Sequence, residues 1–445
     1  MHATGTVSPE LASGLRDYLP EDMIPRQQMF DAIRAVFERF GFSPIDTPGL
    51  EKEAVLTGGD PNFGMQIFRA RLRGADEGLA LRFDLTVPLA RFVSLHFEKI
   101  ERPFKRYHMG KVWRGEKPQA GRYREFVQFD SDIVGTDRIS ADAEIVSLIY
   151  ETMTALGLSR FIIRVNNRKI LNGLAGFAGY DAALGPDILR TIDKLDKIGW
   201  QGVSKELSEK GLTGAQIDVL GQFVSLPNDT VDATLDSLAS LMSASAEALE
   251  GIQELREMAK CIRELGVPPE SWKVDLSVAR GLGYYTGPVF ETILTDLPSI
   301  GSVFSGGRYD GLVARFGSQS LPATGASVGV DRLFAAMETL GLVRREKTVS
   351  QAIILNFDPS AEGYCQRIAA DLRKAQIRTE LYLGTEKNLK GQLAYALRQS
   401  APVIIVAGGN EMAKDVVQVK DMRNRKQIEV LQVRVVESVR GILTL

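Results

Sequence analysis

Few residues that bind metals or form cross-links occur in this sequence. Among its 445 residues are two cysteines, Cys261 and Cys365, and three histidines, His2, His96 and His108. A disulfide framework or a paired zinc motif needs more cysteines at closer spacing, and a histidine-rich metal centre needs more histidines. We therefore expect no disulfide scaffold and no zinc held by the protein, so that any metal ion would arrive with a substrate.

Strong net charge and long apolar runs are also absent. The formal net charge is −2, which argues against a protein that is basic over its whole surface, as many nucleic-acid-binding proteins are. No apolar run approaches the roughly 20 residues that a membrane-spanning helix needs. Residues 1–20 lack the apolar core of a secretion signal. We therefore expect a cytoplasmic protein with no membrane partner.

Length and composition predict more than one globular domain. A hydrophobic fraction of 44% and a charged fraction of 25% are those of a folded, soluble chain. The chain is longer than one ordinary core supports. A charged segment at residues 342–350 separates two different patterns of apolar residues, so we place the domains at residues 1–340 and 350–445.

Apolar periodicity outlines the first domain. Apolar side chains recur at helical spacing over residues 24–40 and stop at Gly41. Strand-like runs follow, and Pro44 and Pro48 mark the first of them as an edge strand. The runs predict a mostly antiparallel sheet. They cover residues 42–51, 79–92, 104–113 and 126–134.

A change of composition interrupts this sheet. Residues from about 168 to 265 are rich in small, aliphatic and acidic side chains at helical spacing, which predicts a helical insertion. Strand character returns at residues 273–278 and 289–294, and a helix is expected at residues 330–340. After the charged linker, strand and helix alternate, which predicts a small, partly parallel sheet of the α/β type.

One stretch combines a cation and two phenols with several glycines. It runs from Arg280 through Tyr284 and Tyr285 to Glu291. Arginine presents a rigid, permanently charged fork of donors, and glycine lets the backbone approach a ligand closely. The stretch indicates a site for a small anionic ligand. A glycine-broken edge strand whose tyrosines only pack is an equal alternative from this segment alone.

Two segments are basic although the whole chain is nearly neutral, and the first indicates phosphate binding. Residues 111–124 hold five cationic residues against Glu116, in a loop between two predicted strands. Arginine forms charge-assisted, often bidentate bonds to phosphate oxygens, and Phe126 after the loop could stack on a base. Residues 411–426 form a weaker patch, for which a solvated surface is the simpler interpretation. For the Gly-rich run before Arg332, taken alone, packing of a helix on a sheet through small residues is the favoured interpretation.

In chain order, the proline-bounded strand, the loop at Arg114 and the helix start at Arg332 resemble the three motifs of class II aminoacyl-tRNA synthetases. Three further segments resemble the histidyl-tRNA synthetase family: LRFDLTVPLARF (residues 81–92), ARGLGYYTGPVFE (residues 279–291) and GGRYDGLV (residues 306–313). The resemblance covers nearly the whole chain, from Gly14 onward.

The resemblance implies a fold, an activity and partners. The implied fold is α/β, with an α+β catalytic domain. This domain holds the class II synthetase antiparallel sheet flanked by helices, with a helical insertion, and a C-terminal α/β anticodon-binding domain follows. The implied activity joins L-histidine to ATP as histidyl-adenylate and transfers histidine to the 3′ end of tRNA(His). Mg²⁺ would accompany ATP, and the protein would be a homodimer.

The resemblance also implies site residues. Arg114 and Arg280 would be catalytic, meeting the α-phosphate. The residues expected to bind histidine are Asp84, Leu85, Thr86, Arg114, Gln128, Asp132, Arg280, Tyr284 and Tyr285, with Asp132 and Tyr285 facing the imidazole. The residues expected to bind ATP are Arg114, Glu116, Arg122, Arg124, Phe126 and Arg332. The residues expected to contact tRNA are Lys420, Arg423 and Arg425.

A second interpretation is the non-catalytic paralogue that regulates ATP phosphoribosyltransferase in histidine biosynthesis. That paralogue resembles the catalytic domain alone, whereas this sequence keeps Arg114, Glu116, Arg280 and Arg332 together with a C-terminal domain. Two glycines depart from the family's usual pattern. Gly283 stands where an acidic residue is common, which puts in doubt the contact that this acid makes. Gly115 replaces a bulkier residue in the loop expected to approach the tRNA acceptor end, so recognition of the tRNA end bases is expected to differ from the commonest scheme.

Overall fold

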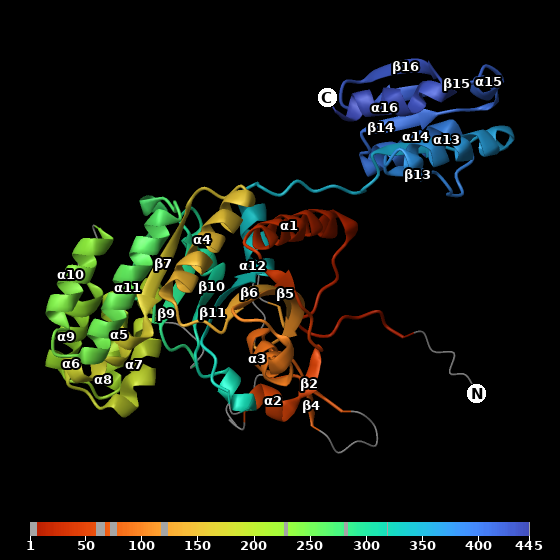
Figure 1. Ribbon diagram of the computed structural model, residues 1–445. Coiled ribbons are helices and arrows are strands. Elements are labelled where there is room, and N and C mark those ends of the chain that lie inside the picture. The colour runs from red at the N-terminus through yellow and green to blue at the C-terminus, as the bar shows by residue number, and fades with distance from the viewer. Residues whose placement is uncertain are drawn as a thin grey trace. The chain divides into compact units, whose positions relative to one another are not determined.

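A computed structural model describes residues 7–58, 67–71, 78–116, 123–226, 230–279, 284–317 and 319–444. The chain divides into two compact units (Figure 1). The N-terminal unit comprises Met1–Arg16 and Met29–Leu342, and the C-terminal unit comprises Asp17–Gln28 and Val343–Leu445. No helix within the described ranges is long and apolar enough to cross a membrane.

An eight-stranded sheet organises the N-terminal unit, in the order β1-β5-β6-β11-β10-β9-β7-β8. The pairs β1–β5 and β7–β8 are parallel and the other pairs are antiparallel. This confirms the predicted antiparallel sheet. The strands are β1 (Ser43–Pro44), β5 (Phe104–Trp113), β6 (Glu125–Val134), β7 (Phe161–Asn167), β8 (Trp272–Val274), β9 (Pro288–Leu294), β10 (Phe304–Arg308) and β11 (Ala323–Gly329).

Helices flank this sheet and form the insertion. Beside the sheet lie the part of α1 (Pro20–Arg39) from Met29 onward, α4 (Ile139–Ala155) and α12 (Val330–Thr339). The predicted helical insertion is confirmed, and Figure 1 shows it in yellow-green to green. Its helices are α5 (Arg168–Asn172), α6 (Leu174–Ala178), α7 (Gly185–Ile192), α8 (Leu195–Glu209), α9 (Gly214–Val224), α10 (Val231–Leu241) and α11 (Ala246–Glu264).

The apolar side of α1 is buried on the sheet of its own chain. Ile33 and Phe37 are fully buried, and the Phe37 ring lies 5.1 Å from that of Phe129 on β6. This burial explains the periodicity of residues 24–40, because those side chains form core. It also removes the buried side of α1 as a surface for pairing with a second copy.

Residues 79–92 were predicted as one strand, and this is wrong. β4 (Leu79–Leu81) is short and belongs to a three-stranded sheet with β2 (Leu50–Lys52) and β3 (Arg69–Ala70), beside α2 (Glu53–Thr57). Helix α3 (Thr86–Leu95) follows, and the Asp84 carboxylate accepts a hydrogen bond from the Val87 N–H at 3.1 Å. A carboxylate that accepts a hydrogen bond from the first turn favours a helix over a strand here.

Strands β10 and β11 were not predicted, because both are rich in glycine. A Cβ atom added to Gly306 would overlap the backbone of β11. Glycine has low strand propensity, but close approach of two backbones requires it. The same glycines leave open space on the face of the sheet that they line.

The C-terminal unit is a second mixed sheet, ordered β13-β12-β14-β15-β16, with helices packed on it. Its alternation of strand and helix was predicted. The strands are β12 (Ala352–Leu355), β13 (Thr379–Leu381), β14 (Val403–Val406), β15 (Val416–Asp421) and β16 (Lys426–Leu431). The helices are α13 (Glu362–Lys374), α14 (Leu389–Gln399), α15 (Gly409–Ala413) and α16 (Val435–Leu443).

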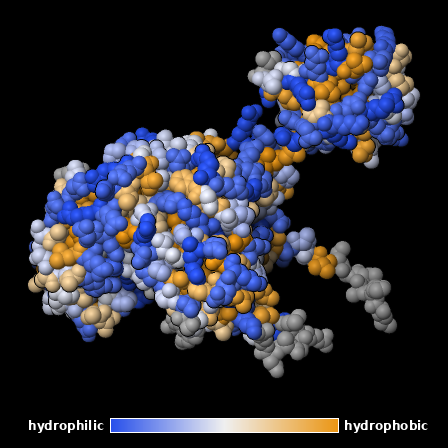
Figure 2. Space-filling model, viewed as in Figure 1, coloured by the Kyte–Doolittle hydropathy of each residue, from blue (hydrophilic) through white to orange (hydrophobic). Residues whose placement is uncertain are grey.

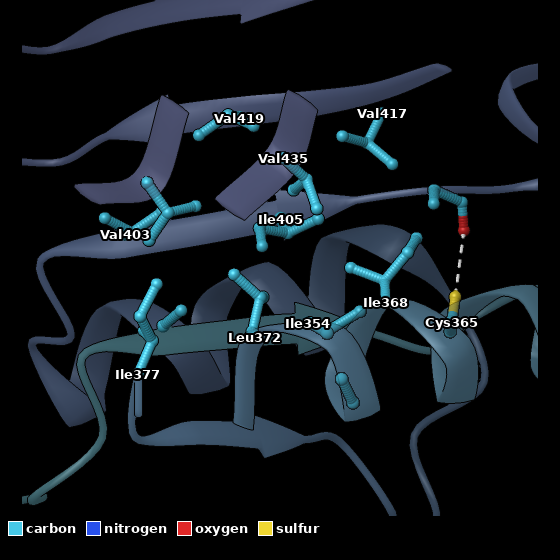
Figure 3. Close-up of a cluster of buried hydrophobic side chains, with 14 of the residues drawn as sticks. Ile354, Cys365, Ile368, Leu372, Ile377, Val403, Ile405, Val417, Val419 and Val435 are labelled. Atoms are coloured by element: carbon cyan, nitrogen blue, oxygen red, sulfur yellow. Dashed lines mark hydrogen bonds between the residues drawn. The ribbon is translucent and has the colours of Figure 1, made fainter. Parts of the chain in front are cut away.

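An aliphatic core holds this unit together. Figure 3 shows Ile354, Ile405, Ile368 and Leu372 facing one another between the strands and α13. Cys365 lies in the same core, where its thiol donates to the Ala407 carbonyl oxygen at 3.5 Å. Burial raises the pKa of this thiol to about 11, so Cys365 serves packing.

On the face shown in Figure 2, hydrophobic residues are interspersed with hydrophilic ones.

A buried ion pair ties the main sheet to α4. The Arg308 guanidinium on β10 contacts the Asp142 carboxylate, and it also donates to the carbonyl oxygens of Thr136 and Arg138 at 3.1 Å each. The Arg308 and Asp142 side chains are 5% and 0% exposed. Removing one member of such a pair leaves a buried charge without its counterion.

We predict that Asp142→Ala lowers the free energy of unfolding by about 3–5 kcal/mol, because Arg308 keeps its charge in a buried site. Asp232 is the control, since its 2.9 Å pair with Arg263 is exposed. Asp232→Ala should cost less than about 1 kcal/mol. Urea titrations followed by circular dichroism measure both values. Equal costs for the two variants would contradict the assigned role of the buried pair.

Candidate active site

Two adjoining cavities lie on one face of the main sheet. They have volumes of about 330 and 320 Å³. Four residues line both cavities, namely Arg114, Gln128, Ser305 and Ser327. The shared residues make the two cavities neighbouring parts of one site, and the Arg114 guanidinium belongs to their common border.

The first cavity is lined by polar and aromatic side chains from distant segments. Asp84 and Thr86 come from the start of α3, and Asp130 comes from β6. Three tyrosines precede β9 or follow β10, namely Tyr284, Tyr285 and Tyr309. The Tyr284 ring centroid lies 5.0 Å from that of Tyr285 and 5.9 Å from that of Tyr309. This mixture of carboxylates and phenols suits a small ligand with several hydrogen-bond donors.

The register of the sheet explains why polar groups gather here. Residues directly opposite each other on paired strands point to the same face. Such pairs continue from strand to strand across the sheet and form one polar row. In order from β5 to β7, the row is His108, Asp130, Ser327, Ser305, Glu291 and Arg164.

Several acceptor oxygens of the first cavity have no donor among the described residues. They are Asp84 Oδ2, Gln128 Oε1 and Asp130 Oδ1, all buried. Gln128 Nε2 donates to Ser327 Oγ at 2.7 Å. Buried acceptors without partners are costly unless a bound molecule supplies donors. An ammonium group and a ring N–H would supply them.

Burial shifts the acidity of these carboxyl groups. It raises the pKa of Asp84 to about 6, against the opposing effects of the Val87 N–H and of Arg114. It raises the pKa of Asp130 to about 7, against the effect of Arg106. Ligand-free protein therefore holds protons on these carboxyl groups at pH values where exposed aspartates are ionised.

Unlike Asp84 and Asp130, Asp132 forms an ion pair within the described part of the chain. Its carboxylate contacts Arg106 at 2.6 Å and accepts a hydrogen bond from the Tyr309 hydroxyl. It lines neither cavity. The Arg106 side chain is 0% exposed, so this pair lies beneath the site. Gly325 of β11 faces Asp132, and an added Cβ would overlap its carboxylate.

The second cavity is lined by charged and aromatic residues that follow β5, begin β6 or start α12. They are Arg114, Glu116, Tyr123, Phe126, Asp331 and Arg332. The Arg114 guanidinium carbon lies 5.1 Å from the Phe126 ring centroid, and Arg114 Nε donates to the Phe83 carbonyl oxygen at 3.0 Å. Asp331 accepts from the Val127 N–H at 2.9 Å, which fixes the start of α12 against β6.

The structure gathers many, though not all, of the predicted site residues. Those that line the cavities are Asp84, Thr86, Arg114, Glu116, Phe126, Gln128, Tyr284, Tyr285 and Arg332. Leu85 is fully buried and, like Arg124, lines neither cavity. Arg124 Nη1 donates to the Ser13 carbonyl oxygen at 3.1 Å. Arg280, Arg122 and Gly283 lie outside the described residues.

Some lining residues were missed in the sequence. Asp130, Ser305, Ser327 and Tyr309 line the first cavity, although none was predicted. Alternation along β6 could have revealed Asp130, because residues 128, 130 and 132 share one face of a strand. Ser305 and Ser327 could not be found this way, since strands β10 and β11 were themselves missed.

Fold and site together define a class II aminoacyl-tRNA synthetase: a largely antiparallel sheet carries a small polar cavity beside a cavity lined by arginines. Family models match both parts of the chain, histidyl-tRNA synthetase over residues 14–333 and the anticodon binding domain over residues 351–442. The chain belongs to the histidyl-tRNA synthetase family.

Similar relatives support this assignment. A histidine–tRNA ligase from Clostridium tetani is 43% identical over 426 residues, which cover 95% of each chain. One from Rhodopirellula baltica is 43% identical over 426 residues, covering 95% of this chain and 96% of its own. The crystal structure of histidyl-tRNA synthetase from Nostoc sp. PCC 7120 has a TM-score of 0.87 at 31% identity and covers 98% of this chain and all of its own.

A fourth protein is similar in fold. It is described as an ATP phosphoribosyltransferase regulatory subunit/histidyl-tRNA synthetase from Bacillus halodurans. Its TM-score is 0.76 at 23% identity, and it covers 91% of this chain and 100% of its own. At this identity the similarity shows the shared fold alone.

The raised pKa of Asp130 predicts how stability depends on pH. Between the ordinary value of 3.8 and about 7, the folded state binds more protons than the unfolded state, so the free energy of unfolding falls as pH rises. Asp130→Asn removes this dependence. We predict that it stabilises ligand-free protein at pH 8, by on the order of 1–4 kcal/mol, and much less at pH 5.

Thermal unfolding at the two pH values measures the effect. Asp232→Asn is the control, because Asp232 is exposed and its change should be small at both pH values. A stabilisation by Asp130→Asn that is equal at pH 5 and pH 8 would contradict the raised pKa.

Proposed function

We propose that the protein is a histidine–tRNA ligase. It activates L-histidine with ATP to histidyl-adenylate and transfers histidine to the 3′ end of tRNA(His). The observation that carries this proposal is the pair of cavities that meet at Arg114. One suits an amino acid with several donors and the other suits a nucleotide, and family membership supports both assignments.

The first cavity binds histidine in this proposal. Asp84 and Gln128 receive the α-ammonium group with Thr86, because two of their oxygens lack donors among the described residues. Leu85 shapes the turn that holds them. Tyr285, with Tyr284 beside it, faces the ring. Asp132 is assigned to the ring as well, and its contacts with Arg106 and Tyr309 hold its carboxylate in place.

ATP occupies the second cavity in the proposal. The adenine ring stacks between Phe126 and Arg332, and Glu116 meets its polar edge. Arg122 and Arg124 are the candidates for the outer phosphates, which Mg²⁺ bridges.

Chemistry takes place at the border of the cavities. A substrate carboxylate that attacks phosphorus brings two anions together, and fixed cations lower this repulsion as charge builds in the transition state. Arg114 lies at the border in the structure. Arg280 is assigned the same function from its sequence motif.

We predict that Arg114→Ala lowers the rate of histidine-dependent pyrophosphate exchange into ATP by 100-fold or more (~3 kcal/mol). The Michaelis constant for histidine should change far less, because the lost interaction is made with the developing charge. Arg91→Ala is the control, since Arg91 pairs with Glu51 at 2.7 Å outside both cavities. Equal losses in kcat and in histidine binding would show that Arg114 serves ground-state binding only.

The regulatory paralogue is the alternative function. It requires that exchange be absent from the unsubstituted protein. The predicted residues that line the two cavities and the C-terminal anticodon binding domain favour the enzyme. We further propose a cytoplasmic homodimer, with a catalytic domain at residues 1–340 and an anticodon-binding domain at residues 350–445.

The C-terminal unit carries a surface suited to RNA. A cavity of about 430 Å³ is lined by cations from three segments, with Glu346 as the acidic residue among them. The cations are Arg344, Arg345, Lys347, Arg378 and Arg423. The exposed turn between β15 and β16 adds Arg425, and Lys420 lies half-buried on β15. A concave basic surface attracts the phosphates of RNA.

We predict that replacing Lys420, Arg423 and Arg425 by Ala raises the Michaelis constant for tRNA(His) at least tenfold and weakens its dependence on salt. Pyrophosphate exchange should be unchanged. Arg423→Ala alone can be compared with Lys374→Ala, because Lys374 is an exposed cation on α13 outside the cavity. Loss of exchange in the triple variant would contradict the division of functions between the units.

A further inference from the structure

A short segment near the N-terminus, residues 12–16, contacts residues in the wall of the second cavity. It begins with a turn, in which the Leu15 N–H donates to the Ala12 carbonyl oxygen at 3.1 Å. Gly14 has a φ of 82°, which a type II turn requires at its third residue and which glycine adopts without strain. We call residues 12–16 the N-terminal strap, and the turn fixes the direction of its carbonyl groups.

Arg124 joins this strap to residues of the second cavity. The Arg124 N–H donates to the Gly14 carbonyl oxygen at 2.9 Å, and Arg124 Nη1 donates to the Ser13 carbonyl oxygen at 3.1 Å. The Arg124 carbonyl oxygen accepts from the Arg114 N–H at 2.9 Å, and Arg124 Nε donates to the Glu116 carbonyl oxygen at 3.2 Å. Arg114 and Glu116 line the second cavity. Through Arg124, the strap therefore supports the main chain of both residues.

Arg16, at the end of the strap, holds a side chain of the same cavity. Its Nη1 donates to the Tyr123 hydroxyl oxygen at 2.9 Å, and its guanidinium carbon lies 5.1 Å from the centroid of the Tyr123 ring. Tyr123 lines the second cavity. A hydroxyl that accepts a hydrogen bond keeps its own hydrogen for a second partner, and no described residue accepts that hydrogen. The Tyr123 hydroxyl can therefore donate to a ligand with acceptor atoms.

We propose that Arg16 is a positioning residue for the nucleotide, which acts through Tyr123, and that the strap is part of the nucleotide site. This inference rests on the proposed function, in which ATP occupies the second cavity. ATP carries acceptors on its phosphates, ribose and adenine. Because Arg16 already fixes the Tyr123 side chain, binding of ATP does not have to order it. Neither residue lines the first cavity, so histidine binding should depend little on them.

Pyrophosphate exchange measures this role when ATP and histidine are varied in turn. Arg16→Ala should raise the Michaelis constant for ATP about tenfold, since Tyr123 is no longer held, and change that for histidine by less than about twofold. Arg16→Lys keeps a cationic donor and should restore the constant for ATP to within about threefold of its original value. Arg39→Ala is the control, because Arg39 is an exposed arginine that pairs with Glu151 at 3.3 Å outside both cavities.

A double-mutant cycle shows whether Arg16 acts through the Tyr123 hydroxyl. Tyr123→Phe removes the hydroxyl and keeps the ring. In that background, Arg16→Ala should raise the Michaelis constant for ATP by less than about threefold, because the hydrogen bond is already absent.

The turn of the strap is tested separately. Gly14→Ala strains the turn and should raise the Michaelis constant for ATP at least about threefold. Gly41→Ala is the matched control, because Gly41 also has a positive φ, 78°, and a Cβ atom there would meet nothing within 4 Å. Equal effects of the two variants on the constant for ATP would show that the strap is not part of the nucleotide site.

Three results would overturn the role of Arg16. One is a Michaelis constant for ATP that Arg16→Ala leaves unchanged while the unsubstituted protein is active. Another is a pair of losses, from Arg16→Ala and Tyr123→Phe, that multiply in the double variant. The third is a parallel rise in the constants for ATP and histidine with a lower Tm, which would show a purely structural role. Absence of histidine-dependent exchange in the unsubstituted protein would instead overturn the proposed function, and this inference with it.

Discussion

The register between β5, β6 and β11 is the constraint on which the site depends. It places Gln128, Asp130 and Asp132 on one face of β6 and sets glycine or serine opposite each of them on β11. A shift of one residue would send all three side chains to the opposite face. Large residues on β11 would fill the space that a ligand needs. Strand pairing thus creates both the polar floor and the room above it.

The same strand pairing buries carboxylates in the sheet, and other parts of the structure supply cations that pair with some of them. Arg106 beneath the floor offsets Asp132, and Arg164 offsets Glu291 at the far end of the polar row. Arg164 also pairs with Asp196 on α8 at 2.7 Å, which links the floor to the helical insertion. Burial raises the pKa values of Asp84 and Asp130 by more than the nearby arginines, Arg114 and Arg106, lower them. Their incomplete compensation leaves capacity for a cationic ligand with N–H donors.

Much of the fold was predicted from local pattern. Strands β5 and β6 alternate with period two, and the helical insertion is uniformly helical in character, so each was identified within a residue or two. Residues 79–92 were misread because an aspartate that accepts a hydrogen bond from the first turn of a helix resembles one more polar position of a strand. Strands β10 and β11 were missed because their glycines allow the backbones of neighbouring strands to approach closely. Local sequence does not reveal such an approach.

The candidate site was predicted in outline. Motifs located the residues that the structure gathers around the two cavities, and the family assignment from those motifs is confirmed. The motifs did not show that Asp130 lines the first cavity while Asp132 contacts Arg106 and Tyr309, because these two partners lie far from Asp132 in the sequence. That distinction depends on the packed structure.

A crystal structure with a non-hydrolysable histidyl-adenylate analogue tests the central claim most directly. The account predicts the adenine in the second cavity, the histidyl group in the first, and the Arg114 guanidinium beside the group that replaces the α-phosphate. An analogue bound elsewhere, or bound with Arg114 turned away from that group, would contradict it.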